Sequence, residues 1–179
     1  MKTLSHLLIA ALFGACLFTS SCKKDSTAAP VDAASSMKFT ANGTDVSLNN
    51  CLQASASVND VVETIISGAN FTNGTAGDAS FEVNIIHDPA TLKAGQTYQM
   101  ITSFGQATDG AILFYYTSLT DIFTTQPANA QGSVTITDVT STTISGTFSG
   151  KLFASGDFSG TKVLYTITNG TFTAKRNLK

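Results

Sequence analysis

Hydrophobic and polar residues alternate with a period of two along most of residues 37–179. Phe81, Val83 and Ile85 are separated by Glu82 and Asn84, for example, and similar runs recur before and after them. Such alternation indicates β-strands that bury one face. We therefore expect residues 37–179 to form a single all-β domain of about nine or ten strands.

Asparagine–glycine pairs separate several of these runs. Asn42-Gly43, Asn73-Gly74 and Asn169-Gly170 are strong signals for two-residue hairpin turns. At the last pair the hydrophobic parity changes, because Ile167 is odd-numbered and Phe172 even-numbered. Either a hairpin or a glycine bulge within one continuous strand explains this change.

Many short strands with short turns favour an antiparallel β-sandwich or a flattened β-barrel. A closed lipocalin-like barrel is the alternative. One short helical turn is expected at 89–94, because Asp88 can cap it, Pro89 suits its first position and Gly95 suits its exit.

Composition excludes several functions. Only 12% of residues are charged, the net charge is −2, and no basic cluster is present, so we expect no nucleic-acid partner. The acidic residues occur singly and no Cys/His cluster or phosphate-binding glycine loop is found, so we expect no metal and no cofactor. His87 is the domain's single histidine and lacks a visible catalytic partner. We interpret it as a strand-end residue and expect no enzyme activity.

The first 21 residues have the organisation of a secretory signal peptide. A basic start, Met1-Lys2, precedes the apolar run Leu7–Phe18 and the small residues Thr19-Ser20-Ser21. As a helix this run would be roughly 18 Å long, which is shorter than the roughly 30 Å core of a bilayer. We therefore expect export rather than a membrane-spanning helix.

Thr19-Ser20-Ser21-Cys22, followed by Lys-Lys-Asp, resembles the lipobox of Bacteroidota lipoproteins. The resemblance implies that Cys22 is the first mature residue and carries acyl chains that bind a membrane. Cys16 is the rival, but cleavage there would leave an apolar run of only Leu7–Leu12. The resemblance predicts a lipid-anchored protein of the cell envelope, with the outer membrane as the expected site and its orientation left open.

Residues 22–36 are expected to be the lipidated cysteine and a flexible tether, because small and polar residues dominate this stretch. Beyond it, the domain resembles small uncharacterised Bacteroidota lipoprotein domains. The motifs that carry this resemblance are Phe39-Thr40-Ala41-Asn42-Gly43, Gly132-Ser133-Val134-Thr135-Ile136-Thr137, Gly146-Thr147-Phe148 and Ile167-Thr168-Asn169-Gly170-Thr171-Phe172. That family has no established activity, so the resemblance implies a fold and no function.

Cys51 is the only other cysteine expected in the processed chain. Strict alternation places it on the polar face of its strand, whereas a bulge at Asn49-Asn50 would turn it inward. We expect a buried, unpaired cysteine, which is the commoner arrangement.

An aromatic cluster is the candidate ligand platform. Phe114, Tyr115 and Tyr116 follow one another, and Tyr98 and Phe123 could lie beside them. A glycan is the ligand that such a platform would suit. The alternative is a central strand buried on both faces, which also reads as a continuous apolar run.

Three functions compete. The first is a lipid-anchored, non-catalytic module that binds or scaffolds an envelope protein or a glycan, and this is the function we expect. The second is a lipocalin-like carrier with an empty apolar cavity, and the third is a hydrolase, which would need His87 in a catalytic cluster. An internal cavity of about 300 Å³ or more would favour the carrier, and a filled interior would favour the scaffold.

Overall fold

The structure is a computed structural model that describes residues 35–58, 61–72, 75–88, 92–102, 109–118, 120–127, 129 and 131–177. The expected signal peptide, Cys22 and nearly all of the tether therefore lie outside the described residues. The first strand begins at Ser36.

Within the described residues the chain forms eleven strands and no helix, which confirms the all-β prediction. The strands are β1 (Ser36–Ala41), β2 (Thr44–Leu48), β3 (Asn50–Val58), β4 (Val61–Thr72), β5 (Thr75–His87), β6 (Thr97–Gln99), β7 (Gly110–Tyr116), β8 (Ile122–Thr124), β9 (Gly132–Val139), β10 (Thr143–Ala154) and β11 (Tyr165–Arg176). They form one mixed sheet in the order β2-β1-β11-β3-β4-β5-β7-β8-β10-β9-β6, with a further pairing between β10 and β11. All strand pairs are antiparallel except β11 with β3.

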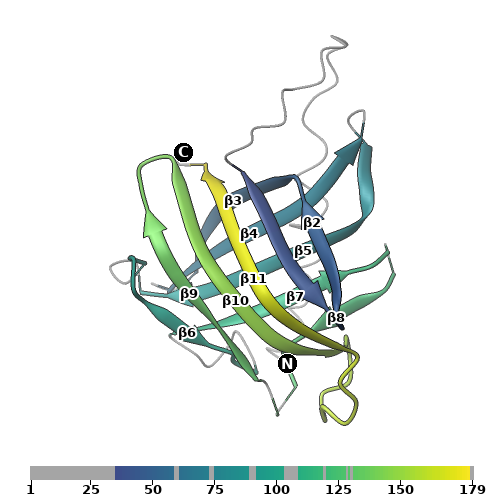
Figure 1. Ribbon diagram of the computed structural model, residues 1–179. Helices are drawn as coiled ribbons and strands as arrows, with labels where there is room; N and C mark the ends of the chain where they lie inside the picture. Colours follow the sequence, from purple (N-terminus) through teal and green to yellow (C-terminus); the bar gives the residue numbers. More distant parts are fainter. Residues whose placement is uncertain are drawn as a thin grey trace.

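This sheet folds over into two layers, as a β-sandwich or flattened barrel does. The front layer contains β6, β9, β10, β11, β1 and β2, and the back layer contains β3, β4, β5, β7 and β8. Figure 1 shows the front strands crossing the back strands at a steep angle. When two sheets cross steeply, they are connected at corners where a strand bends from one sheet into the other.

The alternative prediction, a closed lipocalin-like barrel, is wrong. The two layers are joined by short pairings: Lys175–Arg176 of β11 with Leu52–Gln53 of β3, and Phe153–Ala154 of β10 with Phe123–Thr124 of β8. An isolated bridge also joins Met100, just after β6, to Ala111 of β7. None of these connections is longer than two residues, so none forms a ladder along a whole strand. Strands β2 and β6 stand at the two ends of the strand order.

Asn42-Gly43 forms the predicted two-residue hairpin turn between β1 and β2. Ala41 pairs with Thr44, and both turn residues have positive φ, 48° at Asn42 and 83° at Gly43. This is the backbone that an Asn-Gly type I′ turn provides. Asn73-Gly74 lies outside the described residues.

Asn169-Gly170 is a bulge rather than a hairpin. Strand β11 continues through it, and its pairing with β10 shifts between Phe148 opposite Gly170 and Gly150 opposite Ile167. Asn169 has a φ of 53°, and the pairing with β1 shifts at the same point. The extra residue changes the parity, so that both Ile167 and Phe172 point into the core.

The chain passes from the front layer to the back layer at Asn49. The Asn70 side chain secures this corner, because it accepts a hydrogen bond from the Asn49 backbone N–H (2.8 Å) and donates one to the Ser47 carbonyl (3.0 Å). The crossing changes the parity of the inward-facing residues. Cys51 is consequently buried and unpaired, as expected, while Leu52 is 53% exposed.

The expected helical turn at 89–94 lies partly outside the described residues, which resume at Leu92. From there the chain is irregular and then forms a turn at Ala94 and Gly95. The predicted exit residue, Gly95, has a φ of 85°, which suits glycine.

Aromatic rings from both layers fill the interior. Phe39 of β1 contacts Phe81 of β5 with ring centroids 4.5 Å apart, and Phe81 stacks on Phe148 of β10 at 5.0 Å. Tyr115 of β7 lies edge-on to Phe39 at 5.5 Å. Ring pairs at these separations add to the stabilisation that burial alone provides.

Strands β10 and β11 form two cross-strand pairs in which a phenylalanine lies opposite a glycine. Phe148 lies opposite Gly170, and Phe172 lies opposite Gly146. A Cβ atom on Gly146 would come within 2.5 Å of the Phe172 ring, and one on Gly170 within 2.6 Å of the Phe148 ring. Each ring therefore occupies the space that a side chain on the opposite strand would need.

Replacing Gly170 with alanine should destabilise the fold by about 1–3 kcal/mol, because the added methyl group overlaps the Phe148 ring and the buried core has little room to adjust. The measurement is urea denaturation of the purified protein. Thr171→Ala is the matched control, since Thr171 is the next residue on the same strand and is exposed. Equal losses in both variants would contradict this account of the glycine.

Candidate functional site

The structure separates the five aromatic residues of the expected platform. Tyr98 and Tyr115 are buried in the core, with exposed fractions of 1% and 7%. Phe123 packs partly buried against the same core, 4.8 Å from the Tyr165 ring. These three rings belong to the interior and offer no platform to a ligand, because alternation along β7 turns Tyr115 inward.

Phe114 and Tyr116 lie on the opposite, outer face of β7. Their rings stack at 6.4 Å and both are half-buried. The Tyr116 hydroxyl donates to Glu82 Oε2 at 3.4 Å, so this ring is tied to a carboxylate on the neighbouring strand. Burial raises the pKa of Tyr116, and the nearby Glu82 charge raises it further.

Two glutamates lie on the same outer face of the back layer. Desolvation by burial raises the pKa of Glu82, although hydrogen bonds from Tyr116 and Ser67 partly oppose the shift. Desolvation also raises the pKa of Glu63, which accepts a hydrogen bond from Asn84 at 3.2 Å. Both carboxylates are thus held in surroundings that disfavour their charge.

His87 ends a chain of hydrogen bonds that is buried at Thr64 and reaches the exposed Ser55. Its Nδ1 lies 2.7 Å from the Asp88 carbonyl, which can only accept, so Nδ1 carries the proton and Nε2 accepts from the Thr64 hydroxyl at 3.0 Å. Thr64 in turn contacts Ser55 at 3.3 Å, and Gln53 Nε2 donates to Ser55 at 2.5 Å.

This arrangement resembles a catalytic cluster only superficially. The group that orients the His87 ring is a backbone carbonyl rather than a carboxylate, and the Thr64 side chain is completely buried. A nucleophile must reach its substrate, and Thr64 cannot. We interpret the chain as the means by which the His87 ring, the Thr64 hydroxyl and the Gln53 amide N–H find partners at one end of the core, although Gln53 Oε1 is buried without one.

The β10–β11 connection presents an exposed aromatic ring. Phe158 is 75% exposed at the tip of this loop. Asp157 organises the loop, because its carboxylate accepts hydrogen bonds from the Ser159 hydroxyl at 2.7 Å and the Gly160 N–H at 3.1 Å. The hydrogen bond from Ser159 is the largest of the effects that lower the pKa of Asp157.

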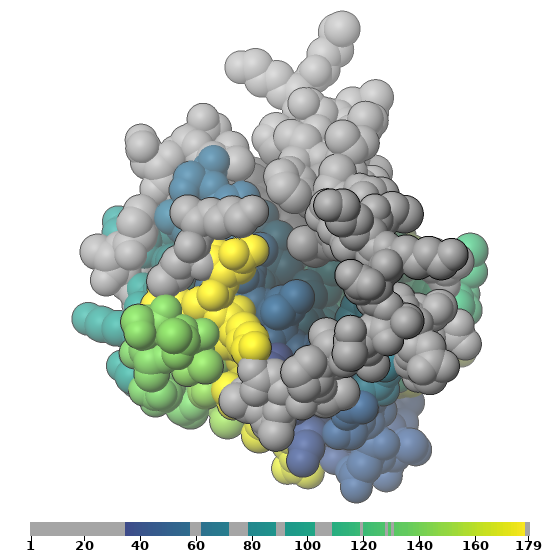
Figure 2. Space-filling view, turned by 90° about the horizontal axis from the view of Figure 1, so that it is seen from above, coloured from purple at the N-terminus to yellow at the C-terminus, as the bar shows by residue number. Residues whose placement is uncertain are grey.

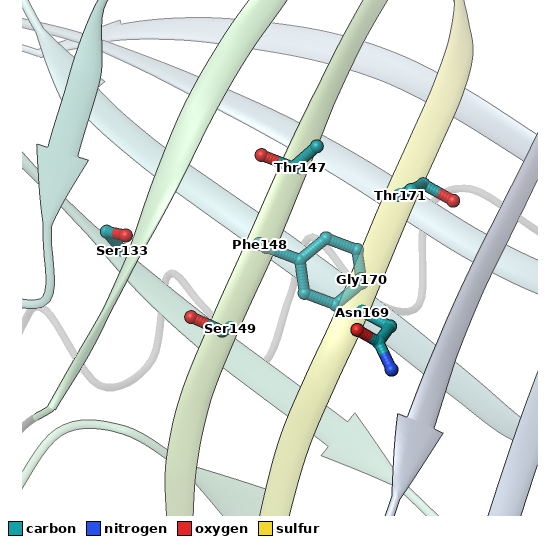
Figure 3. Close-up of a pocket in the computed structure, with 7 residues that line it drawn as sticks. All are labelled: Ser133, Thr147, Phe148, Ser149, Asn169, Gly170 and Thr171. Atoms are coloured by element: carbon teal, nitrogen blue, oxygen red, sulfur yellow. The ribbon is translucent and has the colours of Figure 1, made fainter.

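A shallow hollow of about 380 Å³, open to solvent and lined by polar and apolar surface in similar shares, lies on the outer face of the front layer (Figure 3). It spans three neighbouring strands, β9, β10 and β11. Its lining consists of neutral residues: Ser133, Thr147, Phe148, Ser149, Asn169, Gly170 and Thr171. The Phe148 ring is buried in the core, so the side chains that face the hollow are hydroxyls and one amide.

Strand register explains why these groups lie together. Thr147 is directly opposite Thr171, and Ser149 is directly opposite Ser133. The bulge adds Asn169 to the same face. Other hydroxyl pairs on this face bond to each other, such as Thr97 with Thr135 at 2.9 Å and Ser145 with Thr173 at 3.1 Å.

The polar side chains of the hollow, unlike these pairs, do not bond to each other. Within the described residues, no hydrogen bond from another protein group reaches the side chains of Ser133, Thr147, Ser149, Asn169 or Thr171. Each hydroxyl can donate once and accept twice, and the amide both donates and accepts. The hollow therefore offers a ligand a set of free, neutral hydrogen-bonding groups on a rigid sheet.

Sequence reasoning did not single out these five residues. The signal available was the row of Ser and Thr on the polar parity of residues 133–149 and 166–173. What the sequence lacked was the order of the strands, which brings the three rows side by side, and the choice between hairpin and bulge at Asn169.

The described residues contain no group of three or more His, Cys, Asp or Glu side chains placed to hold a metal ion. They also contain no helix of the length and apolarity that crossing a membrane requires. Burial raises the pKa of the Cys51 thiol to about 12, so this cysteine is a poor nucleophile.

Comparison with known proteins found no counterpart: no family model, no curated protein and no solved structure matches this chain.

Glu82→Gln should make stability less dependent on pH. A carboxyl group whose folded pKa is raised binds its proton more tightly in the folded state, so stability falls as pH rises from the unfolded pKa through the folded pKa. Above that window the wild type retains the full penalty of a buried charge, which glutamine avoids. We expect the variant to lose less stability between pH 4 and pH 8 in denaturant unfolding. Asp138→Asn, at an exposed position, is the control and should leave the wild-type slope.

Proposed function

We propose that this protein is a lipid-anchored module of the cell envelope whose β domain binds or scaffolds a partner without catalysing a reaction. The anchor is acylated Cys22, at the end of a signal peptide that covers residues 1–21. Two or more acyl chains give stable membrane attachment, which a single chain does not. The expected membrane is the outer membrane of a Bacteroidota-type cell.

The filled interior supports a scaffold over a carrier. Aromatic rings from the front and back layers meet at 4.5–5.5 Å where a carrier would need an empty apolar cavity. The side chains without protein partners lie instead on the outside, in the hollow of the front layer. This contrast is the observation that carries the proposal, because surface recognition requires accessible groups and a carrier requires an accessible interior.

A tether from Cys22 would enter the domain at the end opposite the β10–β11 connection. Ser35, the first described residue, is held by the Cys51 backbone: its Oγ donates to the Cys51 carbonyl at 2.5 Å and accepts from the Cys51 N–H at 2.8 Å. The next residue, Ser36, pairs with Thr173 near the end of β11. Figure 1 shows the β10–β11 connection at the other end of these strands. A tether that enters at Ser35 would therefore leave this connection free.

Cys22→Ala is expected to release the protein into the soluble fraction and to abolish labelling by a fatty-acid probe, because it removes the acyl acceptor. Fractionation of cells and metabolic labelling measure the two effects. Cys16→Ala is the matched control and should change neither. A Cys22→Ala protein that is still labelled and stays on membranes would disprove the anchor.

A photo-crosslinking residue at Phe158 in intact cells should capture an envelope component if the loop contributes to binding. The Phe158 ring is exposed on a loop that Asp157 organises, and a large aromatic side chain contributes strongly to binding when an interface buries it. The same crosslinker at exposed Thr137 of β9 is the control for random collisions. Equal, unspecific products at both positions would argue against a partner at the loop.

A further inference from the structure

The charges around the hollow add information on its ligand. Lys38 of β1 lies directly opposite Thr171, and Lys151 follows Ser149 by two residues on the same face of β10. Within the described residues the side chain of neither lysine forms an ion pair or a hydrogen bond with the protein. Two unpaired positive charges therefore flank the free neutral groups.

Together these groups define the chemistry of a ligand. Most binding pockets are lined largely by apolar side chains, and about 300 Å³ is their lower size limit. This hollow, of about 380 Å³, is open to solvent rather than enclosed, and the polar groups that line it are hydroxyls and an amide. Such a lining suits a molecule with many hydroxyl groups, and the flanking lysines suit one that also carries negative charge.

We propose that the hollow, with Lys38 and Lys151, binds an acidic glycan. Sugar hydroxyls exchange hydrogen bonds with Thr147, Thr171 and the other free groups, while carboxylate or phosphate substituents interact with the two lysines. The site is open along the strands, so a polymer can pass across it. This inference rests on the proposed binding function and names its ligand class.

The hydroxyl and charge contributions can be tested separately. The lipid-anchored protein, held in a neutral detergent, is titrated calorimetrically with three polymers: polygalacturonate, which has hydroxyls and charge; dextran, which has hydroxyls only; and poly-L-glutamate, which has charge only. We expect polygalacturonate to bind most tightly. If poly-L-glutamate binds as tightly as polygalacturonate, the proposal is overturned in favour of an acidic protein as ligand. If dextran binds as tightly as polygalacturonate, the ligand need not be acidic and that part of the proposal is overturned.

Matched variants locate the site. Thr147→Val with Thr171→Val keeps the side-chain shape but removes two free hydroxyls, and should weaken polygalacturonate binding roughly tenfold. Thr97→Val with Thr135→Val is the control, because these two hydroxyls already bond to each other on the same face. Equal weakening by both pairs would place the binding elsewhere and overturn the proposal.

A second pair of variants tests the lysines. Lys38→Gln with Lys151→Gln should weaken binding several-fold at low salt, and the difference should disappear at about 0.5 M salt, because exposed charges are screened. Lys93→Gln with Lys162→Gln carries the same change in net charge at other exposed positions and should have little effect. If both pairs weaken binding alike, net charge rather than the site explains it, and the proposal fails.

The outcome also separates this inference from the proposed function. If no polymer binds while a crosslinked envelope partner is still recovered, the acidic-glycan site is wrong and the binding module stands. If neither a polymer nor a partner is found and Cys22→Ala leaves the protein on membranes, both are wrong.

Discussion

The reciprocal aromatic–glycine pairs of β10 and β11 are the constraint on which the two-layer arrangement depends. Phe148 covers Gly170, and Phe172 covers Gly146, so two large rings share one narrow strip of the front layer. From this strip Phe148 reaches Phe81 of the back layer at 5.0 Å. A fully buried phenylalanine contributes roughly 1.5–3 kcal/mol. The pairs therefore place a large part of the core at the centre of the molecule without pushing the strands apart.

The bulge at Asn169 links this core to the surface. Without an extra residue, β11 could direct either Ile167 or Phe172 into the core, but not both. With it, Gly170 is positioned beneath the Phe148 ring, and the Asn169 side chain joins the outer face beside Thr171. The same backbone irregularity thus completes the interior and builds the hollow. The Asn42 side chain supports the nearby start of β11, because it binds the Leu164 carbonyl and the Thr166 N–H, both at 2.8 Å.

Local pattern was enough to predict the fold class and the turn at Asn42-Gly43. The burial of Cys51 was expected from the usual preference of cysteine for the interior, against strict alternation along its strand. It failed where a residue's orientation depends on which layer its strand joins. Leu52 has the parity of a core residue in the sequence, yet the crossing at Asn49 turns it outward. Figure 2 shows the end of β11, in yellow, beside the green β9–β10 connection and the blue back strands. Arg176 meets both neighbours there, pairing with Gln53 and donating to the Thr140 carbonyl at 2.5 Å.

Such long-range pairings also explain why the candidate site escaped sequence analysis. The aromatic run at 114–116 looked like a platform because aromatic residues are conspicuous, but each strand of a two-layer fold turns half of its residues inward. Tyr115 therefore lies in the core, and Phe114 and Tyr116 lie half-buried on the outer face of the back layer. The Ser and Thr residues of the front face have no distinctive local pattern. Their availability for binding becomes visible only when register shows which hydroxyls pair with each other and which do not.

The two outer faces differ in charge, and the difference bears on recognition. The described outward positions of the front layer carry three lysines, Lys38, Lys151 and Lys175, and two aspartates, Asp45 and Asp138. Those of the back layer carry Glu63 and Glu82 and no lysine or arginine. Lysines outnumber aspartates on the front, three against two, whereas the charged residues named on the back are both acidic, so an anionic ligand is favoured on the front over the back. The sign of the charge and the free hydroxyls thus favour the same face, although one follows from the ionisable residues and the other from strand register.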